Sequence, residues 1–152
     1  MPRLKSPKAK GDKYERELAK YFNEKLFNGE ERVARAPLSG GGYVSFASGG
    51  GADLTGLPLW FVEAKAVEKL NVRSALAQVE GNVIKRESPD TPVVINKINR
   101  EAIEDSVVSL RLKDFVALLE IQLRLGGYAE HDERDDKKAI PFNMTDYICG
   151  HP

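Results

Sequence analysis

The stretch DLTGLPLWFVEAK, residues 53–65, places a turn before an apolar run that ends in charged residues. Gly56-Leu57-Pro58 is typical of a turn and residues 59–62 are typical of a β-strand, so we predict a hairpin whose first arm contains Asp53. Because side chains alternate along a strand, Glu63 and Lys65 lie on one face of the second arm. Three charged side chains on an otherwise apolar hairpin indicate a functional site.

The chemistry of this hairpin follows from its two carboxylates. Asp53 and Glu63, converging from neighbouring strands, form a hard-oxygen site suited to Mg²⁺, which polarises a phosphate and lowers the pKa of a bound water. Lys65 beside them is placed to orient that water or to neutralise developing charge. On spacing alone, an ordinary ion pair between Asp53 and Lys65 across the hairpin end is an equally good interpretation.

A helix predicted over residues 12–26 supplies a further observation. Asp12 is the expected N-cap and Asn28-Gly29 the expected end. Glu15 falls within the apolar stripe of this helix, whereas Arg16 points away from it. The stripe is formed by Tyr14, Leu18, Tyr21, Phe22 and Leu26. A carboxylate in a core-facing stripe is costly, so Glu15 either meets a basic partner or joins the other two acids around a metal ion. We favour the second interpretation.

The remaining elements are predicted from hydrophobic periodicity. Leu76, Val79 and Val83 mark a weaker helix, and residues 92–96 and 106–110 have the composition of strands. Residues 114–125 form a helix whose apolar positions are wider than one stripe, so we expect it to be buried or paired. This succession of elements predicts an α/β fold with a central mixed β-sheet flanked by helices.

Length and composition indicate one domain with loose ends. The chain has 152 residues, of which 41% are hydrophobic and 30% charged, as in folded globular proteins. We assign residues 1–11 to a basic flexible arm, 12–128 to the domain and 129–152 to an irregular tail. No apolar run reaches the length of a membrane span and the start lacks a signal peptide, so we expect a cytoplasmic protein. A single cysteine and two histidines make a structural zinc site improbable.

Charge is distributed unevenly although the 23 basic and 23 acidic residues cancel. Basic residues, including Lys10 and Lys13, concentrate near the N-terminus, where they are available to phosphates. Acidic residues crowd the other end, over residues 130–136. The alternative is that both charged ends are solvated tails. Residues 37–51 are rich in glycine and are predicted to form a mobile loop.

Four successive segments resemble one family. They are GDKYEREL (residues 11–18), RVARAPLSG (32–40), ADL (52–54) and VEAK (62–65). In order and spacing these segments resemble the blocks of the archaeal-type Holliday-junction resolvases, which belong to the PD-(D/E)xK nuclease superfamily. The resemblance covers roughly the first half of the chain and implies a restriction-endonuclease-like core.

This resemblance also implies roles for individual residues. Glu15, Asp53 and Glu63 are expected to be metal-site acids and Lys65 to be catalytic, and we add the Ala64 carbonyl as a metal ligand. Positions that the family uses for substrate contact or catalysis are occupied by Arg16, Arg35 and Ser39. The implied activity is Mg²⁺-dependent nicking of two opposed strands of a four-way DNA junction by a homodimer, with Mn²⁺ able to substitute. Phosphate contacts from Lys10 and Lys13 would add affinity without sequence readout.

The chain departs from the family at several points, and alternatives follow. Ala52 stands where the superfamily has proline, the glycine-rich loop is longer, and the tail has no counterpart. A nuclease of the same core acting on duplex, nicked or flapped DNA in repair, restriction or replication is the nearest alternative, and a non-catalytic DNA-binding protein is another. Gln78 is a weak candidate for the site, because a solvent-facing glutamine is the more frequent case on such a helix.

Overall fold

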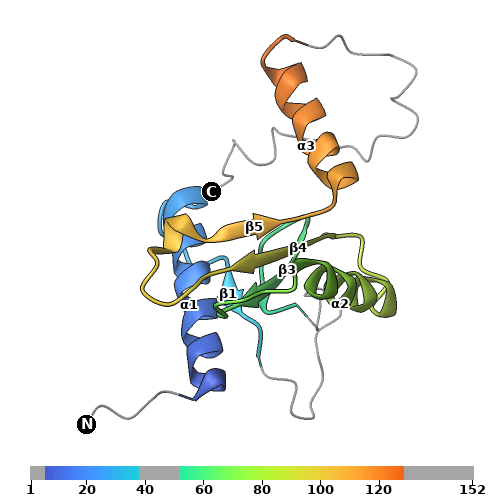
Figure 1. Cartoon of the computed structure of the whole chain (residues 1–152). Helices are drawn as coiled ribbons and strands as arrows, with labels where there is room; N and C mark the ends of the chain where they lie inside the picture. The colour runs from blue at the N-terminus through green and yellow to red at the C-terminus, as the bar shows by residue number, and fades with distance from the viewer. Residues whose placement is uncertain (1–5, 38–51, 129–152) are drawn as a thin grey trace. The chain divides into compact units, whose positions relative to one another are not determined.

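The computed structural model describes residues 6–37 and 52–128 of the chain (Figure 1). The chain divides into two compact units, Met1–Leu112 and Lys113–Pro152. The predicted glycine-rich loop with Ser39, and the predicted tail over residues 129–152, lie outside the described residues. None of the helices in the described ranges combines the length and the apolar character needed to cross a membrane.

Helix α1 spans Pro7–Leu26 and begins earlier than predicted. Its N-cap is Ser6, and Pro7 follows at the first helical position, where a missing N–H costs nothing. The prediction of Asp12 as the N-cap is therefore wrong, because this residue lies inside the helix, and residues 7–11 of the predicted flexible arm are helical. The predicted end at Asn28-Gly29 is confirmed by positive φ angles of 52° and 85°.

Two small β-sheets stand beside α1. The larger sheet has the order β3-β4-β5, with strands Trp60–Lys65, Thr91–Asn96 and Val107–Ser109. It is mixed, as predicted, because β3 runs parallel to β4 whereas β5 runs antiparallel to β4. The smaller sheet pairs β1 (Ala34–Arg35) with β2 (Leu54–Thr55) in antiparallel orientation.

The pairing of β2 differs from the predicted hairpin. Its ladder partner is β1 and not β3. Gly56, with φ at 82°, brings the chain so close to Arg32 that a Cβ there would lie 1.9 Å from the Arg32 carbonyl oxygen. Asp53 connects the two sheets, since its N–H donates to the Val62 carbonyl at 2.9 Å and its carbonyl accepts from the Ala36 N–H at 2.8 Å.

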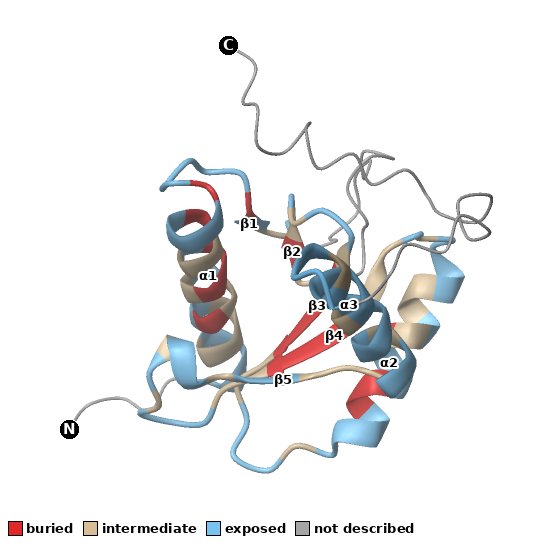
Figure 2. Ribbon diagram, turned by 90° about the horizontal axis from the view of Figure 1, so that it is seen from above, coloured by how far each residue is buried: buried red, intermediate tan, exposed pale blue. Residues whose placement is uncertain are grey.

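The hydrophobic core occupies both faces of β3 and β4. One face packs against α1 and the other against α2 (Val72–Lys85), which confirms the predicted second helix (Figure 2). The cluster on the α1 side includes Leu18, Val62 and Val93. The cluster on the α2 side includes Phe61, Val79 and Val94. Because Glu63 is two residues from Phe61, its side chain shares the face that α2 covers.

The last described helix, α3, spans Leu112–Leu125, and a short 3₁₀ turn over Ile103–Asp105 precedes β5. The helix begins before the predicted residue 114 and ends, as predicted, at Gly126-Gly127, where Gly127 has a φ of 74°. No residue of α3 is buried. The expectation that its wide apolar surface is buried or paired therefore stays a prediction.

Asn23 fixes the chain that leads into β1. This buried side chain donates from Nδ2 to the Val33 carbonyl at 2.8 Å, and its Oδ1 accepts from the N–H groups of Arg32 and Val33 at 3.1 and 2.8 Å. Asn23→Ala would leave these groups unpaired and is expected to lower the free energy of unfolding by about 2 to 4 kcal/mol. The exposed control Glu24→Ala should change it by less than about 0.5 kcal/mol. Urea denaturation measures both, and equal stabilities of the two variants would contradict this role of Asn23.

Candidate functional site

The predicted acids and lysine meet at the end of β3. Asp53 lies beside this strand because its backbone is hydrogen-bonded to Val62, and its Oδ2 accepts from the Ala64 N–H at 2.7 Å. Glu63 is only 5% exposed, on the face of the strand that α2 covers. The sequence therefore placed Asp53 and Glu63 correctly on adjoining backbone segments, although β2 was assigned the wrong ladder partner.

Lys65 and Gln78 surround the buried Glu63. Lys65 Nζ lies 2.5 Å from Glu63 Oε1, and Gln78 Nε2 donates to the same oxygen at 3.2 Å. Gln78 Oε1 in turn accepts from Lys65 Nζ at 3.4 Å. Gln78 is exposed, as expected for this helix, and also contacts both groups. The hydrogen bonds of Lys65 go to Glu63 and Gln78, not to Asp53, so the simple cross-hairpin pair is not the arrangement found.

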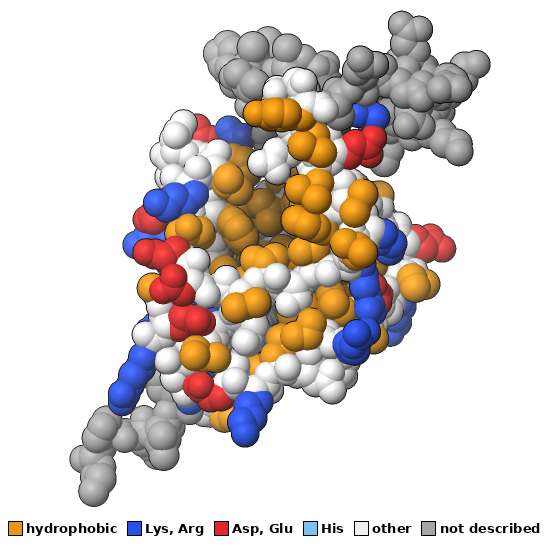
Figure 3. Space-filling view, turned by 45° about the horizontal axis from the view of Figure 1, so that its top comes forward, with side chains coloured by type: hydrophobic (Ala, Val, Ile, Leu, Met, Phe, Trp, Pro, Cys, Tyr) orange, Lys and Arg blue, Asp and Glu red, His pale blue; other side chains and the backbone are white. Residues whose placement is uncertain are grey.

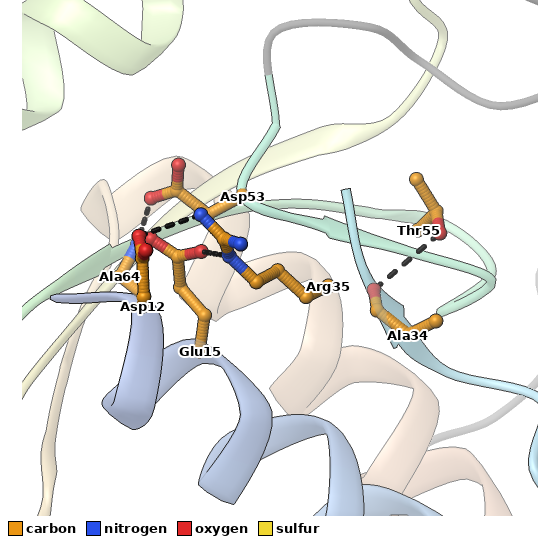
Figure 4. A network of polar contacts seen from close by, with 7 residues as sticks. All are labelled: Asp12, Glu15, Ala34, Arg35, Asp53, Thr55 and Ala64. Carbon is orange, nitrogen blue, oxygen red and sulfur yellow. Dashed lines mark hydrogen bonds and ion pairs between the residues drawn. The ribbon is translucent and has the colours of Figure 1, made fainter. Parts of the chain in front are cut away.

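Arg35 lies against two acids of α1 (Figure 4). Its Nε donates to Glu15 Oε2 at 2.5 Å and its Nη2 to Asp12 Oδ1 at 2.6 Å. The hydrogen bond that Arg35 donates to Glu15 is the main cause that raises the pKa of the Arg35 guanidinium. Of the two alternatives left open for Glu15, a basic partner is therefore present. Asp12 was missed as a site residue, although its i, i+3 spacing from Glu15 puts both acids on neighbouring positions of one helix face.

The pKa of Asp53 is raised by burial and by the neighbouring acids. Burial and the neighbouring Glu63 carboxylate raise the pKa of Asp53 to about 6, and Glu15 contributes in the same direction. The Ala64 N–H and Lys65 oppose this rise. The carboxylates of Glu63 on β3 and Glu15 on α1 therefore both act on Asp53, which lies in the segment before β2.

Neutralising Asp53 should stabilise the metal-free protein. Because the folded pKa of about 6 exceeds the ordinary value of 3.8, this group contributes stability that is fully present below pH 3.8 and is lost as the pH rises through 6. Asp53→Asn keeps an oxygen that can accept from the Ala64 N–H. We therefore expect its free energy of unfolding at pH 7 to exceed that of the wild type by on the order of 1 to 2 kcal/mol. The difference should vanish near pH 4. Denaturation in EDTA at both pH values tests this, and a variant less stable than the wild type at pH 7 would contradict it.

The remaining predicted residues line two surface hollows beside α1. Arg16 is exposed and lines, with Arg35 and Lys20, a surface hollow of about 520 Å³ beside α1. Lys10 and Lys13 line another hollow of about 240 Å³ together with Lys97 and Arg100. Lys13 is also 3.2 Å from Glu17. Among the described residues, Arg16, Lys10 and Lys13 form no ion pair with Asp12, Glu15, Asp53 or Glu63. Ser39 lies outside the described residues.

Asp12, Glu15 and Glu63 are paired with cations of the protein, whereas Asp53 accepts from a backbone N–H. Among the described residues, no three acidic, histidine or cysteine side chains are grouped so as to hold a metal ion. Glu15 is held by Arg35 and Glu63 by Lys65. Four carboxylates, with Asp12 and Asp53 included, against two cations leave a formal charge of minus two when all are ionised. Carboxylate oxygens with this excess charge are what Mg²⁺ takes in proteins.

Comparison of the chain with protein-family models, with curated proteins and with solved structures finds no match. The family resemblance therefore rests on the residues quoted above and on nothing else.

Proposed function

We propose that the chain is a Mg²⁺-dependent DNA endonuclease of the PD-(D/E)xK type with a restriction-endonuclease-like core. The observation that carries the proposal is the meeting of Asp53, Glu63 and Lys65 at the end of β3, with Glu15 close enough to raise the pKa of Asp53. A carboxylate with a raised pKa near a lysine is typical of catalytic centres, and Asp53 is such a group. Mn²⁺ should substitute for Mg²⁺, because both accept oxygen ligands.

Each residue of the centre has a distinct task in phosphodiester hydrolysis. Asp53, Glu63 and the Ala64 carbonyl would hold the cation, with Glu15 as a fourth donor. When bound, Mg²⁺ supplies a polarised phosphate and a more acidic water. Lys65 lies where a cationic Nζ can neutralise charge that develops on the phosphate. Gln78 contacts both Lys65 and Glu63 and so keeps the ammonium and the carboxylate in a fixed relation.

DNA affinity would come from the cations at the rim of the centre. Arg35 adjoins the acids, and Arg16 borders the same hollow. Lys10 and Lys13 extend the basic surface along α1. Contacts of this kind neutralise phosphates and give affinity without reading the base sequence.

The proposed substrate is a four-way junction cut by a homodimer. The resemblance of the four sequence segments supports this choice, and paired incisions need two centres in a fixed relation. Apolar side chains are also exposed in quantity (Figure 3). Val107 and Val108 of the edge strand β5 are 58% and 54% exposed, and α3 separately exposes Phe115 and Ile121 at 45% and 49%. Such surfaces are suited to association between subunits.

Cleavage of matched DNAs tests the substrate. Wild-type protein with Mg²⁺ would be given a four-way junction and linear duplexes made of its individual arms, together with nicked and flapped duplexes. Preferential cutting of the junction supports a resolvase. Equal cutting of the linear arms favours the alternative, a nuclease of the same core acting on duplex, nicked or flapped DNA. Binding without cutting of any DNA favours a non-catalytic protein.

A further inference from the structure

Asp12 is an acid beside the proposed active site to which the proposed function assigns no task. It accepts from Arg35 Nη2 at 2.6 Å, while Glu15, one turn along α1, accepts from Nε at 2.5 Å. The side chains of Asp12, Glu15 and Arg35 are 24%, 15% and 16% exposed, so the contacts are largely shielded from solvent. Ion pairs shielded in this way are held in one geometry more firmly than surface pairs.

The two acids hold the guanidinium at two of its three nitrogens. Among the described residues, Arg35 Nη1 makes no hydrogen bond, so its N–H donors are left over. A guanidinium that is hydrogen-bonded through both Nε and Nη2 has little rotational freedom, so the direction of Nη1 is fixed. Donors fixed in this way suit a phosphate oxygen.

An acid near a DNA-binding surface repels phosphates, so its presence there calls for a compensating role. Asp12 adds one negative charge to a group that already holds Glu15, Asp53 and Glu63, which on charge alone weakens DNA binding. Of the two acids that grip Arg35, Glu15 is also a proposed metal ligand, whereas Asp12 is not. If Glu15 also binds the metal ion, its hydrogen bond to Arg35 is weakened. Asp12 then remains the acid that holds Arg35 in place.

We propose that Asp12 is a positioning residue, which anchors Arg35 to α1 and keeps Nη1 directed at a phosphate of the bound DNA. This inference rests on the proposed function, because it assumes that DNA is the ligand. It has an unusual consequence, since removing the negative charge of Asp12 weakens DNA binding instead of strengthening it.

The test is junction binding in EDTA, measured by fluorescence anisotropy over a range of salt concentrations. We expect Asp12→Ala to bind the junction about tenfold more weakly than the wild type, with the log–log salt slope reduced by about one, as for Arg35→Ala. The double variant should bind no more weakly than Arg35→Ala alone, because both changes remove one contact. Asp12→Asn retains Oδ1 as an acceptor and should recover part of the affinity.

A matched control separates positioning from general electrostatics. Glu104→Ala removes an exposed acid that lines neither of the two hollows and should leave binding unchanged or slightly tighter. If Asp12→Ala binds as tightly as the wild type or tighter, Asp12 only repels DNA and the inference fails. Should the alanine variant not fold, Asp12→Asn is judged by the same criterion. Additive losses in the double variant would also overturn it. Wild-type protein that binds no DNA at all would instead refute the proposed function.

Discussion

Replacing Glu63 by glutamine is expected to reduce junction cleavage about a thousandfold or more. Glu63 is 5% exposed and accepts from both Lys65 and Gln78, so the neutral isostere fits the same space while losing the charge that would hold a cation. Asp53→Asn should have an effect of the same size. Single-turnover rates with enzyme in excess over a labelled junction measure the loss of the chemical step.

The matched control for Glu63 is Glu68. This exposed carboxylate follows β3 closely in sequence and accepts from the Asn99 N–H at 2.8 Å. Glu68→Gln should cleave within about twofold of the wild type, because surface substitutions away from the site rarely matter. Circular dichroism and junction binding in EDTA should be unchanged in Glu63→Gln. Cleavage near the wild-type rate in Glu63→Gln would remove this residue from the active site.

Lys65→Ala is expected to lower turnover about a hundredfold to a thousandfold while cation binding survives. The structure adds a second consequence. Lys65 Nζ is the partner of a buried carboxylate, and removing it leaves Glu63 without a charged partner. A divalent cation would supply the missing charge, so Mg²⁺ should raise the melting temperature of Lys65→Ala more than that of the wild type.

Lys65→Arg distinguishes the catalytic contribution of Lys65 from its structural one. Arginine keeps a positive charge near Glu63 and should restore most of the metal-free stability, but its planar guanidinium cannot present the compact charge of an ammonium. We therefore expect Lys65→Arg to recover most of the wild-type stability but not the wild-type turnover. Thermal melts with and without Mg²⁺ would be compared with single-turnover rates. Wild-type turnover in Lys65→Ala would leave Lys65 with a structural task only.

The acids of the centre were predictable because their signals are local. Strand alternation fixes Glu63 and Lys65 on one face, and the turn at residues 56–58 brings Asp53 back beside the strand. The stripe of α1 marked Glu15 as a carboxylate in need of a partner. None of these inferences required knowledge of how elements that are remote in sequence pack against one another.

Other features depended on tertiary contacts that no local pattern encodes. Arg35 meets Asp12 across 23 residues of chain, and β1 and β2 are two-residue strands too short to have a period. Gln78 reaches Glu63 because of the way α2 lies on the sheet, which helical periodicity does not specify. The start of α1 was a different error, because Ser6-Pro7 is itself a helix-start signal that the prediction of Asp12 as the N-cap overlooked.

Cleavage of a supercoiled plasmid that extrudes a cruciform tests the central claim most directly. Wild-type protein with Mg²⁺ is predicted to convert the plasmid to the linear form by paired cuts, to leave 5′-phosphate ends, and to do neither in EDTA or as Glu63→Gln. A plasmid without the inverted repeat should stay supercoiled. Folded wild-type protein that binds the cruciform yet produces neither nicked nor linear DNA with Mg²⁺ or Mn²⁺ would contradict the assignment of a metal-dependent nuclease.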